Sequence, residues 1–133
     1  HEDVKPFLVG EKEVPNVGTI FNHNFKCKAD IWNPETNTII DIKTTSDINN
    51  FNYSARKYYY NSQAYIYRKL FNAENFVFVV VDKSSQDIGI FETSEEFVEA
   101  GQENVQQAIN VYDRYFSKDS IESVQDYIIK DVL

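Results

Sequence analysis

Two aspartates and a lysine in the first third of the chain have the types and spacing of a group that could bind a cation and contact a phosphate. Asp41 and Lys43 are two residues apart in a run with strand-like alternation, and Asp30 lies near the end of an earlier run of the same kind. Side chains two apart on a strand point to the same face of a sheet. We therefore expect Lys43 to lie beside Asp41, where its ammonium could reach a phosphate or a water molecule.

The segment between the two runs predicts how the aspartates meet. Residues 33–37 read NPETN, which is turn chemistry. A symmetrical hairpin about this turn places Asp30 opposite Asp41, and Lys28 opposite Lys43. Facing carboxylates repel by roughly 0.2–1 kcal/mol, and a bound divalent cation would explain why both are present. The ordinary alternative is a solvated strand face, because Asp-x-Lys is a common tripeptide.

Composition limits the class of protein. The chain has 133 residues and a net charge of −8, so one domain with a genuine core is expected. The charge argues against a general basic coat for nucleic acid but leaves room for a local basic patch beside an acidic metal site. The one cysteine, Cys27, excludes an internal disulfide and a multi-cysteine zinc site. Without a long apolar run or a signal peptide, we expect a cytoplasmic protein with no membrane partner. Because the sequence contains no methionine, we expect it to be part of a longer chain.

The remaining pattern predicts a single domain over residues 1–133, with an arm at 1–12, a core at 13–116 and a C-terminal helical segment at 117–133. The core reads as strand, strand, strand, helix, strand, strand, helix, which indicates an α/β fold with a mixed central sheet flanked by helices. The expected elements after the hairpin are a helix at 51–71, a buried strand at 76–81, a strand at 88–92, and a helix that starts with a capping box at 93–96 and runs to Phe116.

These motifs in this order resemble the PD-(D/E)XK nuclease superfamily. They are Asp30, then Asp41-Ile42-Lys43, then Gln63 and Tyr67 one turn apart on the following helix. The stretches KCKAD, IIDIKTT and YNSQAYIY are also similar to the RecE-type exonucleases (exodeoxyribonuclease VIII) and their phage and prophage relatives. The resemblance runs from about residue 13 to about residue 116. Each short motif is weak alone, whereas three in order form a fairly specific match.

The resemblance implies a restriction-endonuclease-like core and a deoxyribonuclease that depends on Mg²⁺, with Mn²⁺ as the other candidate. Asp30, Asp41 and the carbonyl of Ile42 would hold the metal. Lys43 would orient or activate the attacking water. Gln63 and Tyr67 would help to position DNA or metal, which completes a catalytic set whose members are Asp30, Asp41, Lys43, Gln63 and Tyr67.

The resemblance also implies a substrate and partners. Lys28, and with it Lys26 and Thr45, would contact the backbone of double-stranded DNA, so cleavage would be independent of sequence. Members of the family digest linear duplexes from the 5′ end in recombination or phage DNA processing, pass the single strand to an annealing protein, and often form homo-oligomeric rings.

One family feature is missing from this sequence. RecE-type enzymes carry a metal-site histidine on a helix upstream of the first strand, and neither His1 nor His23 has that context. We expect the N-terminal helix of the family to be absent from this piece. Three other hypotheses remain: a nuclease fold that binds nucleic acid or protein without cutting, a structural domain with a coincidental hairpin, and an endonuclease of the same superfamily.

Overall fold

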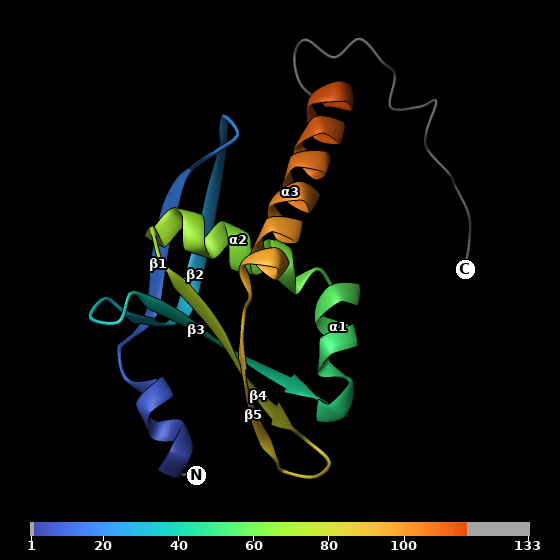
Figure 1. Ribbon diagram of the computed structural model, residues 1–133. Helices are drawn as coiled ribbons and strands as arrows, with labels where there is room; N and C mark the ends of the chain where they lie inside the picture. The colour runs from blue at the N-terminus through green and yellow to red at the C-terminus, as the bar shows by residue number, and fades with distance from the viewer. Residues whose placement is uncertain (1, 117–133) are drawn as a thin grey trace.

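A computed structural model describes residues 2–116 and shows a five-stranded mixed sheet with helices packed on it (Figure 1). The strands follow the order β1-β2-β3-β4-β5, in which β3 and β4 are parallel and every other pair is antiparallel. This arrangement confirms the predicted α/β fold. The strands are β1 (Glu11–Ile20), β2 (His23–Asn33), β3 (Thr38–Thr45), β4 (Asn75–Asp82) and β5 (Ile88–Glu92); the helices are η1 (Glu2–Leu8), η2 (Ile48–Asn50), α1 (Phe51–Lys57), α2 (Tyr60–Phe71) and α3 (Glu95–Tyr115).

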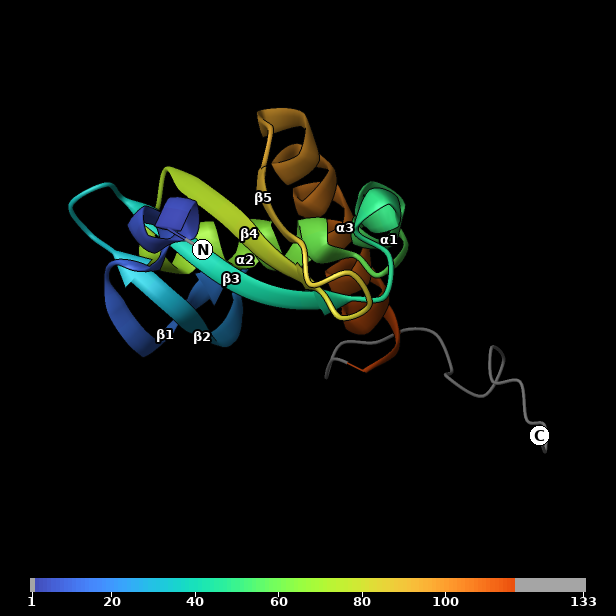
Figure 2. The same ribbon diagram turned by 90° about the horizontal axis from the view of Figure 1, so that it is seen from below.

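The two faces of the sheet are covered by different elements. The larger core lies under α1, α2 and α3, where Ile39, Phe76 and Phe78 are buried. The opposite face carries a smaller cluster in which Val4 of η1 packs with Ile31, Ile40, Val77 and Val79, and Figure 2 shows η1 on the side of β3 away from α2. Since side chains alternate along a strand, Asp41 and Lys43 share the helix-covered face with Ile39.

The hairpin between β2 and β3 has the predicted register, but the ladder is short. Its pairs are Asn33 with Thr38, Trp32 with Ile39, and Ile31 with Ile40. Beyond the last pair, β2 stays with β1 as far as the pair Ile20–His23, while β3 turns away with β4 (Figure 1). The two strands therefore part at Asp30 and Asp41, and the ladder includes neither the predicted pair of Asp30 with Asp41 nor that of Lys28 with Lys43.

The prediction of one helix over residues 51–71 is wrong, because two helices occupy this range. Tyr59 adopts a left-handed conformation with φ 58° between α1 and α2. The break lets both helices face the same core ring, since Phe51 and Tyr60 each lie with their ring centroids 5.8 Å from that of Phe78. The chain at the break is a run of three tyrosines, and aromatic residues lose side-chain freedom in a helix.

The first segment is also different from its prediction. Residues 1–12 were expected to form an arm, yet η1 occupies Glu2–Leu8 and β1 begins at Glu11. Val4 is buried, and Phe7 and Leu8 pack against the same cluster. Three apolar side chains among charged neighbours are enough to hold this short helix on the sheet. The C-terminal helical segment predicted at 117–133 lies outside the described residues.

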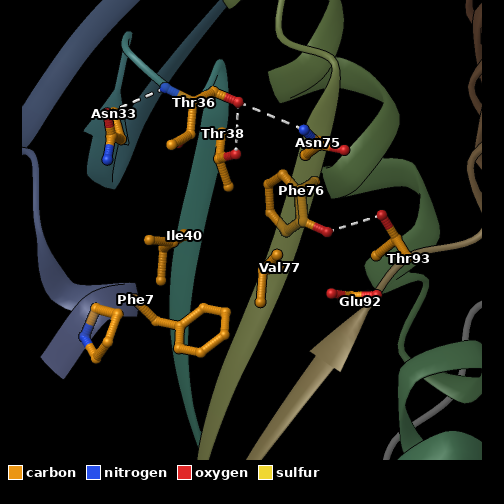
Figure 3. Close-up of a pocket in the computed structure, with 11 residues that line it drawn as sticks. Phe7, Asn33, Thr36, Thr38, Ile40, Asn75, Phe76, Val77, Glu92 and Thr93 are labelled. Atoms are coloured by element: carbon orange, nitrogen blue, oxygen red, sulfur yellow. Dashed lines mark hydrogen bonds between the residues drawn. The ribbon is translucent and has the colours of Figure 1, made fainter. Parts of the chain in front are cut away.

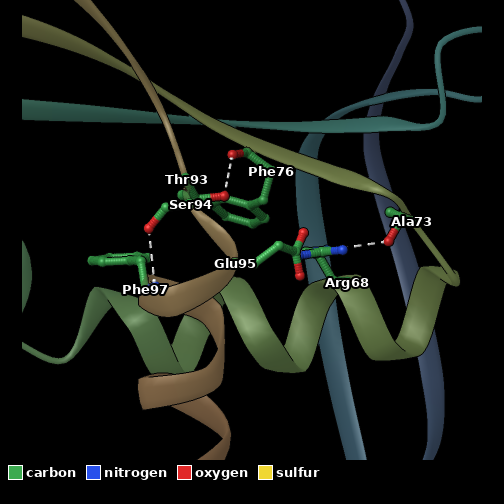
Figure 4. A network of polar contacts seen from close by, with 7 residues as sticks. All are labelled: Arg68, Ala73, Phe76, Thr93, Ser94, Glu95 and Phe97. Atoms are coloured by element: carbon green, nitrogen blue, oxygen red, sulfur yellow. Dashed lines mark hydrogen bonds and ion pairs between the residues drawn. The ribbon is translucent and has the colours of Figure 1, made fainter.

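Helix α3 is fixed at its start and by its crossing with α2. Ser94 caps α3 by accepting a hydrogen bond from the Phe97 N–H, whereas Thr93 donates to the Phe76 carbonyl, so the capping box predicted from Thr93 does not form (Figure 4). Arg68 of α2 forms an ion pair with Glu95 at 3.2 Å. At the crossing, a Cβ on Gly101 would clash with the Asn61 backbone, so the two helices approach as closely as a glycine allows.

No helix within residues 2–116 combines the length and the apolar character needed to cross a membrane.

Candidate functional site

Asp41 is the centre of the polar group that the structure places between β3 and α2. Its side chain is buried, with the residue only 5 % exposed. Gln63 Nε2 donates a hydrogen bond of 2.8 Å to Asp41 Oδ1. Lys43 Nζ lies 3.1 Å from Asp41 Oδ2, but the geometry of this ion pair is not that of a directed hydrogen bond. Oδ2 is therefore buried, accepts no hydrogen bond of regular geometry from the described residues, and has the Lys43 ammonium as its neighbour.

The electrostatics of Asp41 follow from its burial. Loss of solvent raises the pKa of this carboxyl to about 6. The charge of Lys43 and its close contact with the carboxylate lower the pKa, the charge of Asp30 raises it, and the hydrogen bond from Gln63 lowers it. A buried carboxylate with incomplete compensation attracts a cation, because a positive charge would restore what burial removes.

Asp30 lies across the point where the strands part. Its Oδ2 accepts a 2.8 Å hydrogen bond from the backbone N–H of Ile42. In a longer ladder that N–H would face the backbone of β2, so the Asp30 side chain takes the place of a missing strand–strand hydrogen bond. Its charge acts on Asp41, which agrees with the prediction that the two carboxylates lie on one face.

Lys43 is held by an aromatic ring that the sequence reasoning missed. Its Nζ lies 4.4 Å from the ring centroid of Tyr60 at the start of α2. A cation over an aromatic face is attracted by the ring quadrupole. Tyr60 and Asp41 therefore hold the ammonium on the side of the site that faces α2. No spacing in the sequence links Tyr60 with Lys43, because they meet only through the packing of α2 on β3.

Gln63 and Tyr67 are brought together as predicted. Burial raises the pKa of the Tyr67 phenol, while hydrogen bonds with the Gln63 side chain and the Lys28 backbone lower it. Gln63 thus lies between the phenol and Asp41. Tyr67 also packs its ring against Phe76, with centroids 5.8 Å apart, so it anchors this end of the group in the core.

The residues expected to contact DNA occupy two places. Lys26 and Lys28 are exposed on β2. Thr45, at the end of β3, exchanges hydrogen bonds with the backbone of Asp47, so its hydroxyl shapes the exit from the strand. His23, for which no metal role was expected, bonds to Asp113 of α3 at 2.8 Å.

The donor set fits a hard divalent cation in part. The charge of Asp30 acts on Asp41, and Asp41 Oδ2 accepts no hydrogen bond of regular geometry from the described residues, which suits a cation that prefers oxygen ligands. Ile42, whose carbonyl was predicted as a ligand, sits between Asp41 and Lys43 and is 46 % exposed. No group of three or more His, Cys, Asp or Glu side chains with metal-binding geometry occurs within residues 2–116. A cation here would complete its shell with water or substrate oxygens.

A cavity of about 360 Å³ lies on the other face of the sheet and includes none of these residues (Figure 3). Phe7 of η1, Ile40 and Val77 line its floor, and Glu92 and Thr93 line one side. Its lining contains a single carboxylate, and Asp41 lies on the helix-covered face. We therefore place the candidate chemistry at Asp41, beside α2.

The comparisons agree with the fold. Residues 1–123 match the model of a family described as a PDDEXK-like domain of unknown function (DUF3799), and the chain belongs to that family. A solved structure described as a "Putative exonuclease" from Eubacterium rectale is similar over 86 % of this chain, with 20 % identity and a TM-score of 0.77. A phage related exonuclease from Haemophilus somnus 129PT is similar over 85 % of this chain, with 20 % identity and a TM-score of 0.55.

The chain spans 48 % of the first of these structures and 64 % of the second. At this identity the likeness establishes the fold. No curated protein matches the chain.

Proposed function

We propose that this domain is the core of a metal-dependent DNA exonuclease of the RecE type that hydrolyses phosphodiester bonds in linear double-stranded DNA. The observation that carries the proposal is Asp41: a buried carboxylate that interacts with the Asp30 charge and has the Lys43 ammonium 3.1 Å from its Oδ2. The PDDEXK-like family and the exonuclease names of two structural neighbours support the same class. Recombination or phage DNA processing is the proposed setting.

Each residue has a part that follows from its contacts. Asp30 and Asp41, with the carbonyl of Ile42, would hold Mg²⁺ or Mn²⁺. When bound, such an ion lowers the pKa of a water ligand and neutralises charge on a phosphate. Lys43 places a positive charge beside Asp41, where it can orient a water molecule and stabilise the charge that develops on the phosphate oxygens.

The two helix residues act through Asp41. Gln63 holds Oδ1 by a hydrogen bond, which leaves Oδ2 to Lys43 and to the metal that we propose. Tyr67 fixes Gln63 in turn. Lys26 and Lys28, exposed on β2, would contact phosphates and carry no sequence information. A ring of subunits around DNA and an annealing protein as recipient of the single strand belong to the same proposal.

The test is digestion of linear and of closed circular duplex DNA by the intact protein, with Mg²⁺ or with a chelator. We expect loss of linear DNA only, and only with metal. Asp41→Asn, which keeps the acceptor for Gln63, should slow digestion by on the order of 10²–10³-fold. Glu35→Gln is the matched control, because this carboxylate is exposed at the other end of the same hairpin.

Two outcomes would contradict the proposal. Equal cleavage of circular DNA would identify an endonuclease. No cleavage of either substrate by folded protein with metal would favour the alternative, a nuclease fold that binds nucleic acid or protein without cutting. The two-carboxylate donor set in the described residues is the observation that keeps this alternative open.

A further inference from the structure

Three tyrosines are exposed to solvent, one in α1 and two at the junction of α1 and α2. Tyr53 is 61 % exposed, Tyr58 59 % and Tyr59 62 %; we refer to them as the tyrosine cluster. Aromatic side chains normally bury most of their large surface, and contiguous exposed apolar surface marks a place where another molecule binds. None of the three belongs to either core cluster, so the fold itself does not use these rings.

The backbone at the junction keeps the rings outside the core. Tyr59 has φ 58°, a left-handed conformation that is common for Gly, Asn and Asp and seldom adopted by other residues. It separates the last turn of α1 from the first turn of α2, so Tyr58 and Tyr59 belong to neither helix. Strained residues of this kind concentrate at ligand-binding sites.

The sequence next to the tyrosine cluster is basic, although the net charge of the chain is −8. Residues 48–67 contain Arg56 and Lys57 and no Asp or Glu. Lys57 Nζ lies 5.5 Å from the ring centroid of Tyr58 and 5.9 Å from that of Tyr53. Among the described residues, Lys57 forms no ion pair with a carboxylate, so its charge is available to an anion.

A chain of contacts connects the tyrosine cluster with the candidate active site. The rings of Tyr58 and Tyr60 have centroids 6.3 Å apart. Tyr60 in turn holds Lys43 Nζ at 4.4 Å, and Lys43 lies 3.1 Å from Asp41. A ligand that covers Tyr58 would therefore be connected to Asp41 through the contacts of Tyr60 and Lys43.

We propose that the tyrosine cluster binds the unpaired bases of single-stranded DNA by stacking, with Lys57 on the phosphates, and directs that strand toward Asp41. Exposed rings together with a basic side chain are the combination that single-strand binders use, since every base has a face that stacks and every nucleotide has a phosphate. Paired bases inside a duplex do not offer those faces. The direction of the strand toward Asp41 rests on the proposed function, whereas the stacking does not.

The test measures binding of the intact protein to a fluorescent oligothymidine of about twelve nucleotides in chelator, so that nothing is cut. An abasic oligonucleotide of the same length separates stacking from charge. We expect Tyr58→Ala to weaken oligothymidine binding by about tenfold and to leave abasic binding unchanged. Tyr59→Asn should act in the same direction without loss of stability, because Asn tolerates the left-handed backbone.

Two controls make the result specific. Tyr58→Phe keeps the ring and should bind like the wild type. Tyr112→Ala removes another half-exposed tyrosine, on α3 beside His23, and should also bind like the wild type. Lys57→Ala should weaken binding to both oligonucleotides and reduce the dependence of affinity on salt.

Unchanged oligothymidine binding in folded Tyr58→Ala would overturn the proposal, as would an equal loss for the abasic oligonucleotide. Failure of the wild type to bind oligothymidine, combined with normal cleavage of linear duplex, would assign the rings to a protein partner and also overturn it. Stacking-dependent binding by a protein that cuts no DNA would support the stacking inference and contradict the proposed nuclease function.

Discussion

The two ends of the β2–β3 hairpin are built in opposite ways. At the turn end, three residue pairs form a regular ladder, and Asn33 accepts hydrogen bonds from the N–H groups of Glu35 and Thr36. Ile39 and Ile40 are buried on opposite faces of this end. At the other end the ladder stops, two carboxylates replace apolar pairs, and Oδ2 of Asp41 has no hydrogen-bond donor among the described residues.

This difference shows how the sheet makes room for a site. A continuous ladder would pair the backbone of β2 with that of β3 and leave no space beside Asp41. Because β2 leaves with β1, the Ile42 N–H needs a new acceptor, and Asp30 supplies it. The turn end therefore carries the stability of the hairpin, while the open end gives up stability to place polar groups side by side.

The largest expected effect is a difference in the free energy of unfolding between two isoleucine substitutions on β3. Ile39→Ala should lower the free energy of unfolding by about 2–5 kcal/mol, because Ile39 is fully buried in the helix-side core. Ile42→Ala is the matched control at the open end, where the side chain is 46 % exposed, and should change stability by no more than about 0.5 kcal/mol. Urea denaturation measures both; equal losses would mean that the two ends are not different.

A second prediction concerns the pH dependence of Asp41 in metal-free protein. The pKa of about 6 in the folded state lies above the ordinary value of an aspartate. Between about pH 4 and pH 6 the native state thus keeps a proton that the unfolded chain has lost, and stability falls as the pH rises. Asp41→Asn does not titrate, so at pH 7.5 it should be more stable than the wild type by on the order of 1–3 kcal/mol.

The difference between wild type and Asp41→Asn should shrink as the pH is lowered through this window, which denaturation in chelator at several pH values would measure. Glu35→Gln, at the turn end, should show no such trend. A constant difference across the window would mean that burial does not control this carboxyl.

The smallest expected effect separates the two parts that Asp30 plays. Asp30→Ala removes the acceptor of the Ile42 N–H and should cost about 0.5–1.5 kcal/mol. Asp30→Asn keeps an oxygen for that N–H and removes the repulsion with Asp41, so its stability should equal or exceed that of the wild type by a few tenths of a kcal/mol. Thermal unfolding in chelator compares them; identical stabilities would show that the hydrogen bond contributes nothing.

Sequence reasoning found the parts of the fold that local chemistry determines. The turn at 33–37 and the alternation on both sides give the register, and the apolar run before Asp82 gives a buried strand. They also give the shared face of Asp30 and Asp41. The order of strands and helices followed from the same patterns, which is why the fold class was predicted correctly.

What the sequence did not predict depends on contacts between distant segments. The β2–β3 ladder ends where β2 continues with β1 and β3 continues with β4. No residue in the hairpin indicates that point. The break at Tyr59 lies inside a pattern that also suits one continuous helix. Tyr60 acquires its contact with Lys43 only after α2 packs on β3, and η1 is held by Val4 through residues far along the chain.

The close crossing of α2 and α3 connects a position without a side chain to the candidate site. Any Cβ at Gly101 would clash with the backbone of Asn61, so one of the two helices would have to shift. Gln63 lies two residues further along α2 and donates to Asp41. A larger residue at position 101 would therefore act on Asp41 through the path of α2, although α3 supplies none of the groups that we propose meet the substrate.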